Sequence, residues 1–255
     1  MASGIEGKKG MAEVVIARNT AELAELAARH FLTASHAAIK ANGRFCVALS
    51  GGSTPLVLYR LLSQPPYVDQ ISWKNIQFFW GDERCVAPDH PDNNFGMARQ
   101  ALLNIVPVQT EQIHRIEGEF GANNAARRYA HHLHTYFGEV SFPVFDLILL
   151  GLGVDGHIAS LFPASPALNE NQWWTAAVEH AVPPPPLVDR VTLTLPVINA
   201  AREVVFLASG ADKARVIARI LMKTDEDDSQ LPAQMVHPGS GKITWYVDRL
   251  AYSIP

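Results

Sequence analysis

Two segments that follow predicted buried strands carry side chains suited to binding an anion. Residues 50–54 (Ser-Gly-Gly-Ser-Thr) combine hydroxyls with glycines at the start of a predicted helix. Free backbone N–H groups and the positive end of a helix dipole favour a phosphate there. In the second segment an aromatic strand runs into Asp82, Glu83 and Arg84, and the planar guanidinium of Arg84 fits phosphate or carboxylate oxygens. The alternatives are a tight turn with a capping serine and a surface turn with internal ion pairs.

A third segment, residues 151–157, places His157 beside Asp155 just beyond the most buried-looking strand. An imidazole with an unperturbed pKa of about 6.5 is suited to act as a general base at neutral pH. The alternative is a structural histidine. The same segment matches the Gly-x-Gly-x-x-Gly dinucleotide fingerprint, but Pro163 and Pro166 interrupt the long helix that this fingerprint requires. We therefore reject NAD binding.

A fourth candidate is Lys213, predicted in the first turn of a helix capped by Asp212. A cation at this end opposes the helix dipole, which prefers anions. Either a bound anion lies between the lysine and the helix, or Asp212 pairs with the lysine. The sequence favours the bound anion.

Composition excludes several classes of protein. The chain has 255 residues and a net charge of −4, and without a basic cluster nucleic acid is not an expected partner. Its longest apolar run, residues 147–154, is far short of the roughly 20 residues that span a membrane. The N-terminus lacks a secretory signal, and residues 1–10 read as a leader before Met11. Cys46 and Cys85 form neither a disulfide framework nor a metal-ligand pattern, so we expect a cytoplasmic protein with no metal.

Short apolar runs alternate with segments of helical period, which predicts an α/β fold. We expect residues 11–255 to form one modified Rossmann-like domain, a mostly parallel sheet with helices on both faces. In such sheets ligands bind beyond the carboxyl ends of the strands, so the candidate segments should meet at one edge. Only a helix is expected before the first strand. Other expected features are a stiff proline connector and a solvated acidic loop. The predicted strands are 45–49, 76–80, 144–150, 191–195, 203–208 and 243–247. Of the predicted helices, three are capped by Thr20, Asn123 and Asp212, one has Pro55 in its first turn, and one begins near Asn93 or Asn94. The proline connector is 183–186 and the acidic loop is 225–228.

Taken together, six segments resemble the 6-phosphogluconolactonase family in the expected order: 48–55, 80–84, 90–95, 151–163, 190–196 and 209–213. The family is related to glucosamine-6-phosphate deaminase/isomerase. That enzyme differs in carrying Tyr where this chain has Arg84, and Asn-Glu-Pro where this chain has residues 160–163. One position departs from the family pattern, because Asn93 stands where Ser usually precedes Asn94.

The resemblance implies hydrolysis of 6-phospho-D-glucono-1,5-lactone to 6-phosphogluconate, an oxidative pentose phosphate step, without metal or organic cofactor. His157 would activate water for attack on the lactone carbonyl and then pass the proton to the ring oxygen. Asp155 and Asp82 would orient His157 or contact sugar hydroxyls, and backbone N–H groups of residues 153–156 would hold the oxyanion. The implied substrate and phosphate contacts are Ser50, Gly51, Gly52, Ser53, Thr54, Arg84, Gly153 and Lys213, with Arg190 as an addition.

Two other functions stay open at this stage. A deaminase/isomerase would use Asp82 as a carboxylate base. A non-catalytic phosphosugar sensor would keep the pocket to control transcription, but such proteins usually carry a DNA-binding helix-turn-helix, for which the N-terminal segment has too few helices. The expected partner is a small phosphosugar lactone, with no nucleic acid and no membrane, and the expected state is a monomer or weak homodimer.

Overall fold

The computed structural model describes residues 12–222 and 230–253. The expected leader at residues 1–10 and the acidic loop at 225–228 lie outside these residues. No helix among the described residues is long and apolar enough to cross a membrane.

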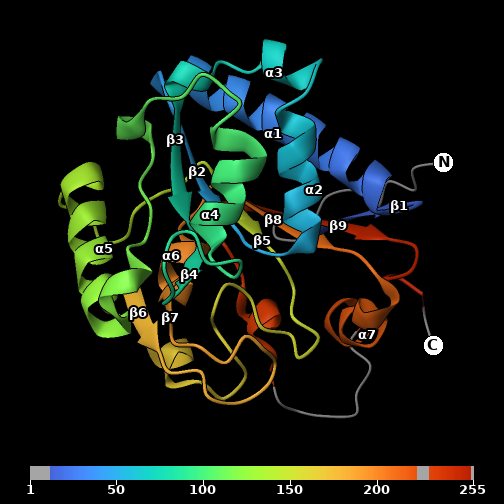
Figure 1. Cartoon of the computed structure of the whole chain (residues 1–255). Coiled ribbons are helices and arrows are strands. Elements are labelled where there is room, and N and C mark those ends of the chain that lie inside the picture. Colours follow the sequence, from blue (N-terminus) through green and yellow to red (C-terminus); the bar gives the residue numbers. More distant parts are fainter. Residues whose placement is uncertain (1–11, 223–229, 254–255) are drawn as a thin grey trace.

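A parallel sheet forms the centre of the molecule (Figure 1). The strand order is β1-β9-β8-β5-β2-β3, and every neighbouring pair is parallel. This confirms the expected α/β class with a mostly parallel sheet. The strands are β1 (Glu13–Ala17), β2 (Phe45–Leu49), β3 (Ile76–Trp80), β5 (Leu147–Leu150), β8 (Glu203–Ala208) and β9 (Lys242–Asp248).

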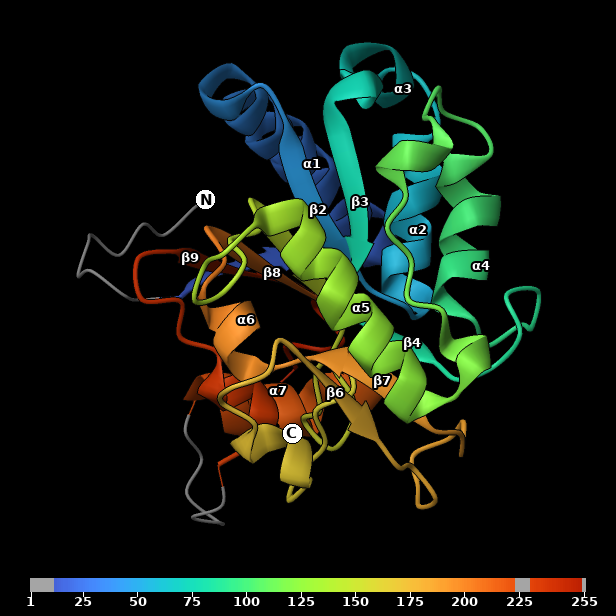
Figure 2. The ribbon, with the colours of Figure 1, turned by 90° about the vertical axis from the view of Figure 1, so that its left-hand side faces the viewer.

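Helices cover both faces of this sheet (Figure 2). Successive side chains of a strand point to opposite faces, and in β2 and β3 the pairs Phe45↔Ile76 and Ala48↔Phe79 therefore face opposite ways. Phe45 packs edge-on against Phe31 of α1, whereas Phe79 packs against α5. The helices are α1 (Thr20–Asn42), α2 (Ser53–Leu62), α3 (Tyr67–Gln70), α4 (Asn94–Ala98), α5 (Ala122–Phe137), α6 (Leu195–Asn199) and α7 (Ala214–Met222).

A second, antiparallel sheet was not expected from the sequence. Its strands, in the order β4-β7-β6, are β4 (Asp82–Arg84), β7 (Arg190–Leu193) and β6 (Thr175–Val178). The segment read as a strand end or charged turn is thus β4, paired with β7. The predicted strand 191–195 is shorter than expected, because Leu195 already begins α6 with Pro196 in its first turn.

Several predicted boundaries were wrong. The expectation of only a helix before the first strand fails, because β1 precedes α1 and pairs with β9. Asn19 rather than Thr20 caps α1, accepting the N–H of Glu22. Gly121 rather than Asn123 precedes α5, and Asp212 lies inside a 3-10 turn that leads into α7. In each case the predicted cap lies one or two residues inside the helical segment.

Candidate active site

The candidate segments meet at one cavity of about 250 Å³. It opens beyond the carboxyl ends of β2 and β5, where open α/β sheets bind ligands. The sequence-predicted residues in its lining are Ser50, Gly51, Gly52, Asp82, Arg84, Gly153, His157, Arg190 and Lys213. Three predicted residues do not line it: Ser53 is exposed, the Thr54 hydroxyl pairs with Ser209 at 2.9 Å, and Asp155 reaches the site through His157.

His157 and Asp155 form a close pair at the cavity. The imidazole Nδ1 lies 2.6 Å from Asp155 Oδ1, and the His157 N–H donates to the same oxygen at 3.2 Å. Burial disfavours the charged form of Asp155, but the hydrogen bond and charge of His157 outweigh it and hold the pKa of this carboxyl below its ordinary value. An ionised Asp155 accepts the Nδ1 proton and leaves Nε2 as the basic nitrogen. Among the described residues, none hydrogen-bonds Nε2.

Backbone contacts shape the loop after β5. Gly156 adopts φ +83°, a conformation that favours glycine. The N–H of Gly153 donates to the His157 carbonyl at 2.9 Å, and the N–H of Gly156 donates to the Gly153 carbonyl at 3.0 Å. These two donors hold the loop together, so neither glycine N–H is free in this structure for the oxyanion that residues 153–156 were expected to hold.

Two arginines face each other across β4 and β7. Arg84 and Arg190 are direct register partners, and like charges placed opposite each other are destabilising. Neither forms an ion pair with a described carboxylate: Arg84 donates to the carbonyl of Asp92, Arg190 donates to that of Pro186, and the Nε atoms of both are buried without a partner. Burial and the charge of Arg84 lower the pKa of Arg190. An anion in the cavity would supply the missing partner.

Lys213 pairs with Asp212, which the sequence left open as the alternative to a bound anion. Its Nζ lies 3.2 Å from Asp212 Oδ2, and the side chain also lines the cavity. Asp212 is largely exposed, and exposed ion pairs are weak. The lysine is therefore available to a second anion.

The sequence did not single out two residues that position Asp82. The carboxylate is 3 % exposed, and it accepts a hydrogen bond from Ser160 Oγ at 2.6 Å and one from Asn94 Nδ2 at 3.3 Å. Asn94 sits against Gly51, where an added Cβ would overlap its side chain. Asn94 and Ser160 lie in segments 90–95 and 151–163, which resemble the family, and this resemblance was the sequence signal that could have identified them.

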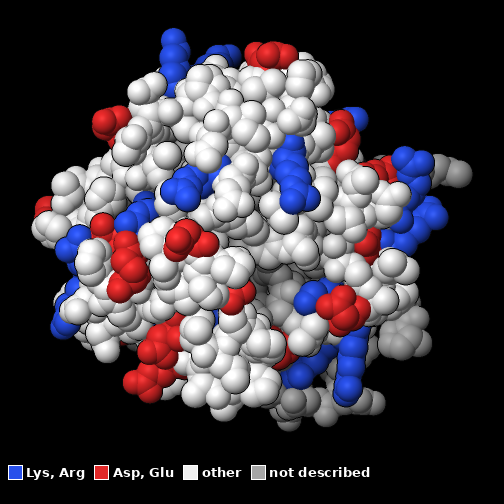
Figure 3. All heavy atoms as spheres, viewed as in Figure 1, with Lys and Arg blue, Asp and Glu red and all other residues white. Residues whose placement is uncertain are grey.

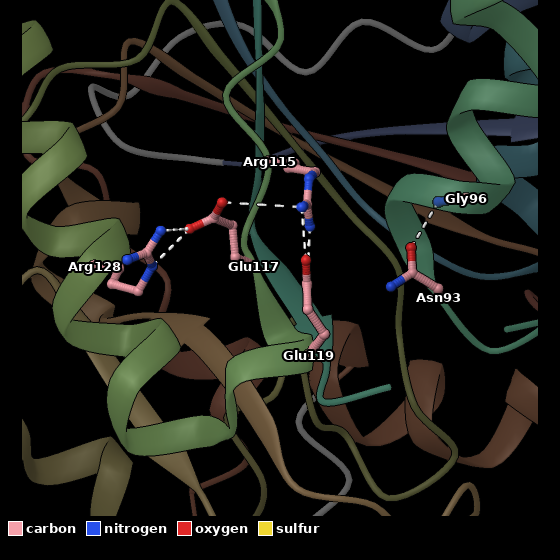
Figure 4. A network of polar contacts seen from close by, with 6 residues as sticks. All are labelled: Asn93, Gly96, Arg115, Glu117, Glu119 and Arg128. Carbon is pink, nitrogen blue, oxygen red and sulfur yellow. Dashed lines mark hydrogen bonds and ion pairs between the residues drawn. The ribbon is translucent and has the colours of Figure 1, made fainter. Parts of the chain in front are cut away.

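Glu83 holds the start of α4 in place. Its carboxylate is fully buried and accepts the N–H groups of Arg84, Asn94 and Phe95 at 2.7–2.8 Å. Asn93 caps the same helix through the N–H of Gly96 at 2.7 Å (Figure 4). Asparagine and serine are comparable N-caps, so the departure at Asn93 preserves this function.

An ion-pair network lies beside α4. Arg115 makes two hydrogen bonds to Glu119, at 2.6 and 2.9 Å, and Glu117 bridges Arg115 and Arg128 (Figure 4). The Arg115 guanidinium lies 5.6 Å from the ring centre of Phe95. The network thus fixes the chain before α5 against the helix that carries Asn94.

Comparisons with known proteins agree with this geometry. Residues 18–245 match the family model described as Glucosamine-6-phosphate isomerases/6-phosphogluconolactonase. The chain belongs to this family. The 6-phosphogluconolactonase of Homo sapiens is 42% identical over 214 residues, covering 83% of this chain and 81% of the human protein. Probable 6-phosphogluconolactonase 1 of Arabidopsis thaliana is 38% identical over 255 residues, covering 96% and 94%.

A solved structure of the family shares the fold over nearly the full length. The 6-phosphogluconolactonase from Trypanosoma cruzi superposes with a TM-score of 0.84 at 31% identity, covering 96% of this chain and 98% of that chain. The candidate site of this chain is lined by residues that follow β2 and β5 of the parallel sheet and by residues of β4 and β7 of the antiparallel sheet.

Glu83 gives a prediction for pH-dependent stability. Burial raises the pKa of its carboxyl from 4.5 to about 7, although three N–H donors oppose the shift. The folded chain then binds more protons than the unfolded chain between these values, so this contribution is fully present below pH 4.5 and is lost as the pH rises through 7. We expect the free energy of unfolding of the wild type, minus that of Glu83→Gln, to fall by on the order of 3 kcal/mol between pH 4 and pH 8.

Urea denaturation at both pH values measures this difference, and subtracting the variant cancels the other titrating groups. An equal pH dependence in wild type and variant would contradict the assignment to Glu83.

Proposed function

We propose that this chain hydrolyses 6-phospho-D-glucono-1,5-lactone to 6-phosphogluconate. The observation that carries the proposal is one cavity lined by His157, whose imidazole pairs with Asp155 behind it, and by three cationic side chains, Arg84, Arg190 and Lys213. The first can activate water, and the second can bind a phosphate. The family relatives that share most of the chain are named 6-phosphogluconolactonases.

In the proposed mechanism, His157 is the general base. Asp155 accepts the Nδ1 proton, so Nε2 takes a proton from water as the water oxygen attacks the lactone carbonyl. The tetrahedral intermediate then collapses, the bond from C1 to the ring oxygen breaks, and the imidazolium returns its proton to that oxygen. The products are a carboxylic acid and a free hydroxyl, with His157 restored.

The cationic residues anchor the substrate phosphate. Arg84 and Arg190 offer buried, unpartnered N–H groups. Gly51 and Gly52, which directly precede α2, add backbone N–H groups at the helix end that favours anions. Holding a remote phosphate orients the carbonyl over the base, and such positioning can remove about 7 kcal/mol of the barrier in favourable systems. Asp82, fixed by Ser160 and Asn94, would accept a hydrogen bond from a hydroxyl of the sugar.

The deciding experiment is a lactonase assay on freshly generated substrate, corrected for spontaneous hydrolysis. We expect saturable acceleration that depends on the phosphate, so that glucono-1,5-lactone without phosphate is a poor substrate. Ammonia release from glucosamine 6-phosphate without lactone opening would refute the proposal in favour of a deaminase. Binding of 6-phosphogluconate without turnover would indicate a sensor.

Lys213→Ala is expected to raise KM about tenfold with little change in kcat, because hydrogen bonds to charged groups contribute about 1.5–3 kcal/mol. Asp212→Ala is the matched control: it removes the exposed partner of Lys213 and should leave KM unchanged or lower. Steady-state kinetics of both variants provide the test. A loss confined to kcat in Lys213→Ala would argue against a phosphate contact.

We also propose that the protein acts in the cytoplasm as a monomer or weak homodimer. Cys46 and Cys85 are both free thiols, as is usual in a reducing compartment. The charged residues on the face shown in Figure 3 are of both signs and interspersed, without the basic surface typical of nucleic-acid binding. Light scattering across a range of protein concentrations would measure the oligomeric state.

A further inference from the structure

Four consecutive prolines, residues 183–186, lie in the loop between β6 and β7. Pro184 and Pro185 form part of the cavity wall. Proline has no backbone N–H, so this segment can be held to the protein only through its carbonyl oxygens and ring contacts. The donors that reach those carbonyls therefore determine how firmly the wall is fixed.

Two buried side chains supply such donors. Arg190 Nη2 donates to the Pro186 carbonyl at 3.0 Å. His180 Nε2 lies 2.6 Å from the Pro184 carbonyl, and because a carbonyl oxygen only accepts, Nε2 carries the proton. Arg190 also faces the proposed phosphate, whereas His180 does not line the cavity. His180 is thus a contact to the wall that does not depend on the substrate.

The ring of His180 makes a second connection to the site. It is 4 % exposed and stacks on Phe162, with ring centres 4.1 Å apart and an interplanar angle of 14°. Phe162 in turn contacts His157, with ring centres 4.5 Å apart, and lies 5.3 Å from the Arg190 guanidinium. One aromatic ring therefore joins His180 to the proposed base.

We propose that His180 is a positioning residue with two separable roles. Its Nε2–H holds the proline segment as a fixed wall against the bound lactone, and its ring, through Phe162, supports the orientation of His157. The assignment of these effects to lactone binding and turnover rests on the proposed function. The two roles predict different kinetic effects, because the wall contacts the substrate and Phe162 contacts the base.

Two variants separate the roles. His180→Phe keeps a ring to stack on Phe162 but cannot donate to Pro184, and we expect KM to rise about threefold to tenfold with kcat within about twofold of wild type. His180→Gln keeps an N–H donor without the ring, and we expect KM within about twofold of wild type and a fall in kcat of about threefold or more. Equal KM in His180→Phe and wild type, or equal increases of KM in both variants, would overturn the proposal.

A measurement without substrate keeps this test distinct from that of the proposed function. The N–H of Cys85 donates to the carbonyl of Asp189, just after the proline segment, at 2.8 Å. Hydrogen exchange at this amide should be faster in His180→Phe than in wild type and unchanged in His180→Gln. Unchanged exchange in His180→Phe would refute the anchoring role whatever the substrate. Absence of lactone turnover by the wild type would refute the proposed function and leave the exchange result standing.

Discussion

Replacing His157 with Ala is expected to lower kcat for lactone hydrolysis by about 10²–10⁴-fold, the usual contribution of general acid–base catalysis. Among the described residues, His157 is the one that we propose as the proton acceptor. The carboxylate of Asp155 holds its imidazole through Nδ1 at 2.6 Å. The phosphate contacts do not involve this ring, so the dissociation constant of 6-phosphogluconate should change little. Steady-state kinetics and calorimetric titration measure the two quantities.

His131→Ala is the matched control, because His131 is an exposed histidine on α5 that does not line the cavity. It should retain wild-type kcat. Unchanged turnover in His157→Ala would remove His157 from the mechanism, and loss of 6-phosphogluconate binding in the same variant would show that the ring acts in binding instead.

The central sheet could be predicted because each of its strands from β2 onward is a short apolar run bounded by turn residues, as at 45–49 and 203–208. The antiparallel sheet could not. β4 has the sequence Asp-Glu-Arg, which carries no apolar alternation, and its strand conformation comes from pairing with β7, far away in the sequence. Long-range pairing of this kind has no local signal.

The candidate site was likewise predictable only in part from the sequence. His157 and the loop at residues 50–52 were predictable because polar residues follow strands whose carboxyl ends share one edge. Arg190 immediately precedes the predicted strand 191–195, and only the structure shows that it lies opposite Arg84 and that its guanidinium contacts a carbonyl rather than a carboxylate. Ser160, in a loop, and Thr54, in the first turn of α2, both carry hydroxyls near the cavity, yet one fixes Asp82 and the other pairs with Ser209. Side-chain direction in loops depends on packing that the sequence does not display.

Gly153→Ala should reduce kcat by about 10²-fold, the cost of a small misplacement of catalytic groups. An added Cβ at this position would overlap the His157 imidazole and lie 2.5 Å from Asp155 Oδ1. The φ angle of Gly153 is not in the positive region, so alanine strains no backbone there, and the effect comes from displacing the pair. Kinetics, together with thermal unfolding to confirm a folded protein, measure the outcome.

Gly239→Ala provides the comparison, because a Cβ there meets no atom within 4 Å and Gly239 also lacks a positive φ. It should keep full activity. The contrast between the two alanines tests geometry rather than chemistry, since neither substitution adds or removes a titratable or hydrogen-bonding side chain. Wild-type kcat in Gly153→Ala would mean that the positions of His157 and Asp155 relative to the cavity do not limit turnover, and the base would have to be sought elsewhere.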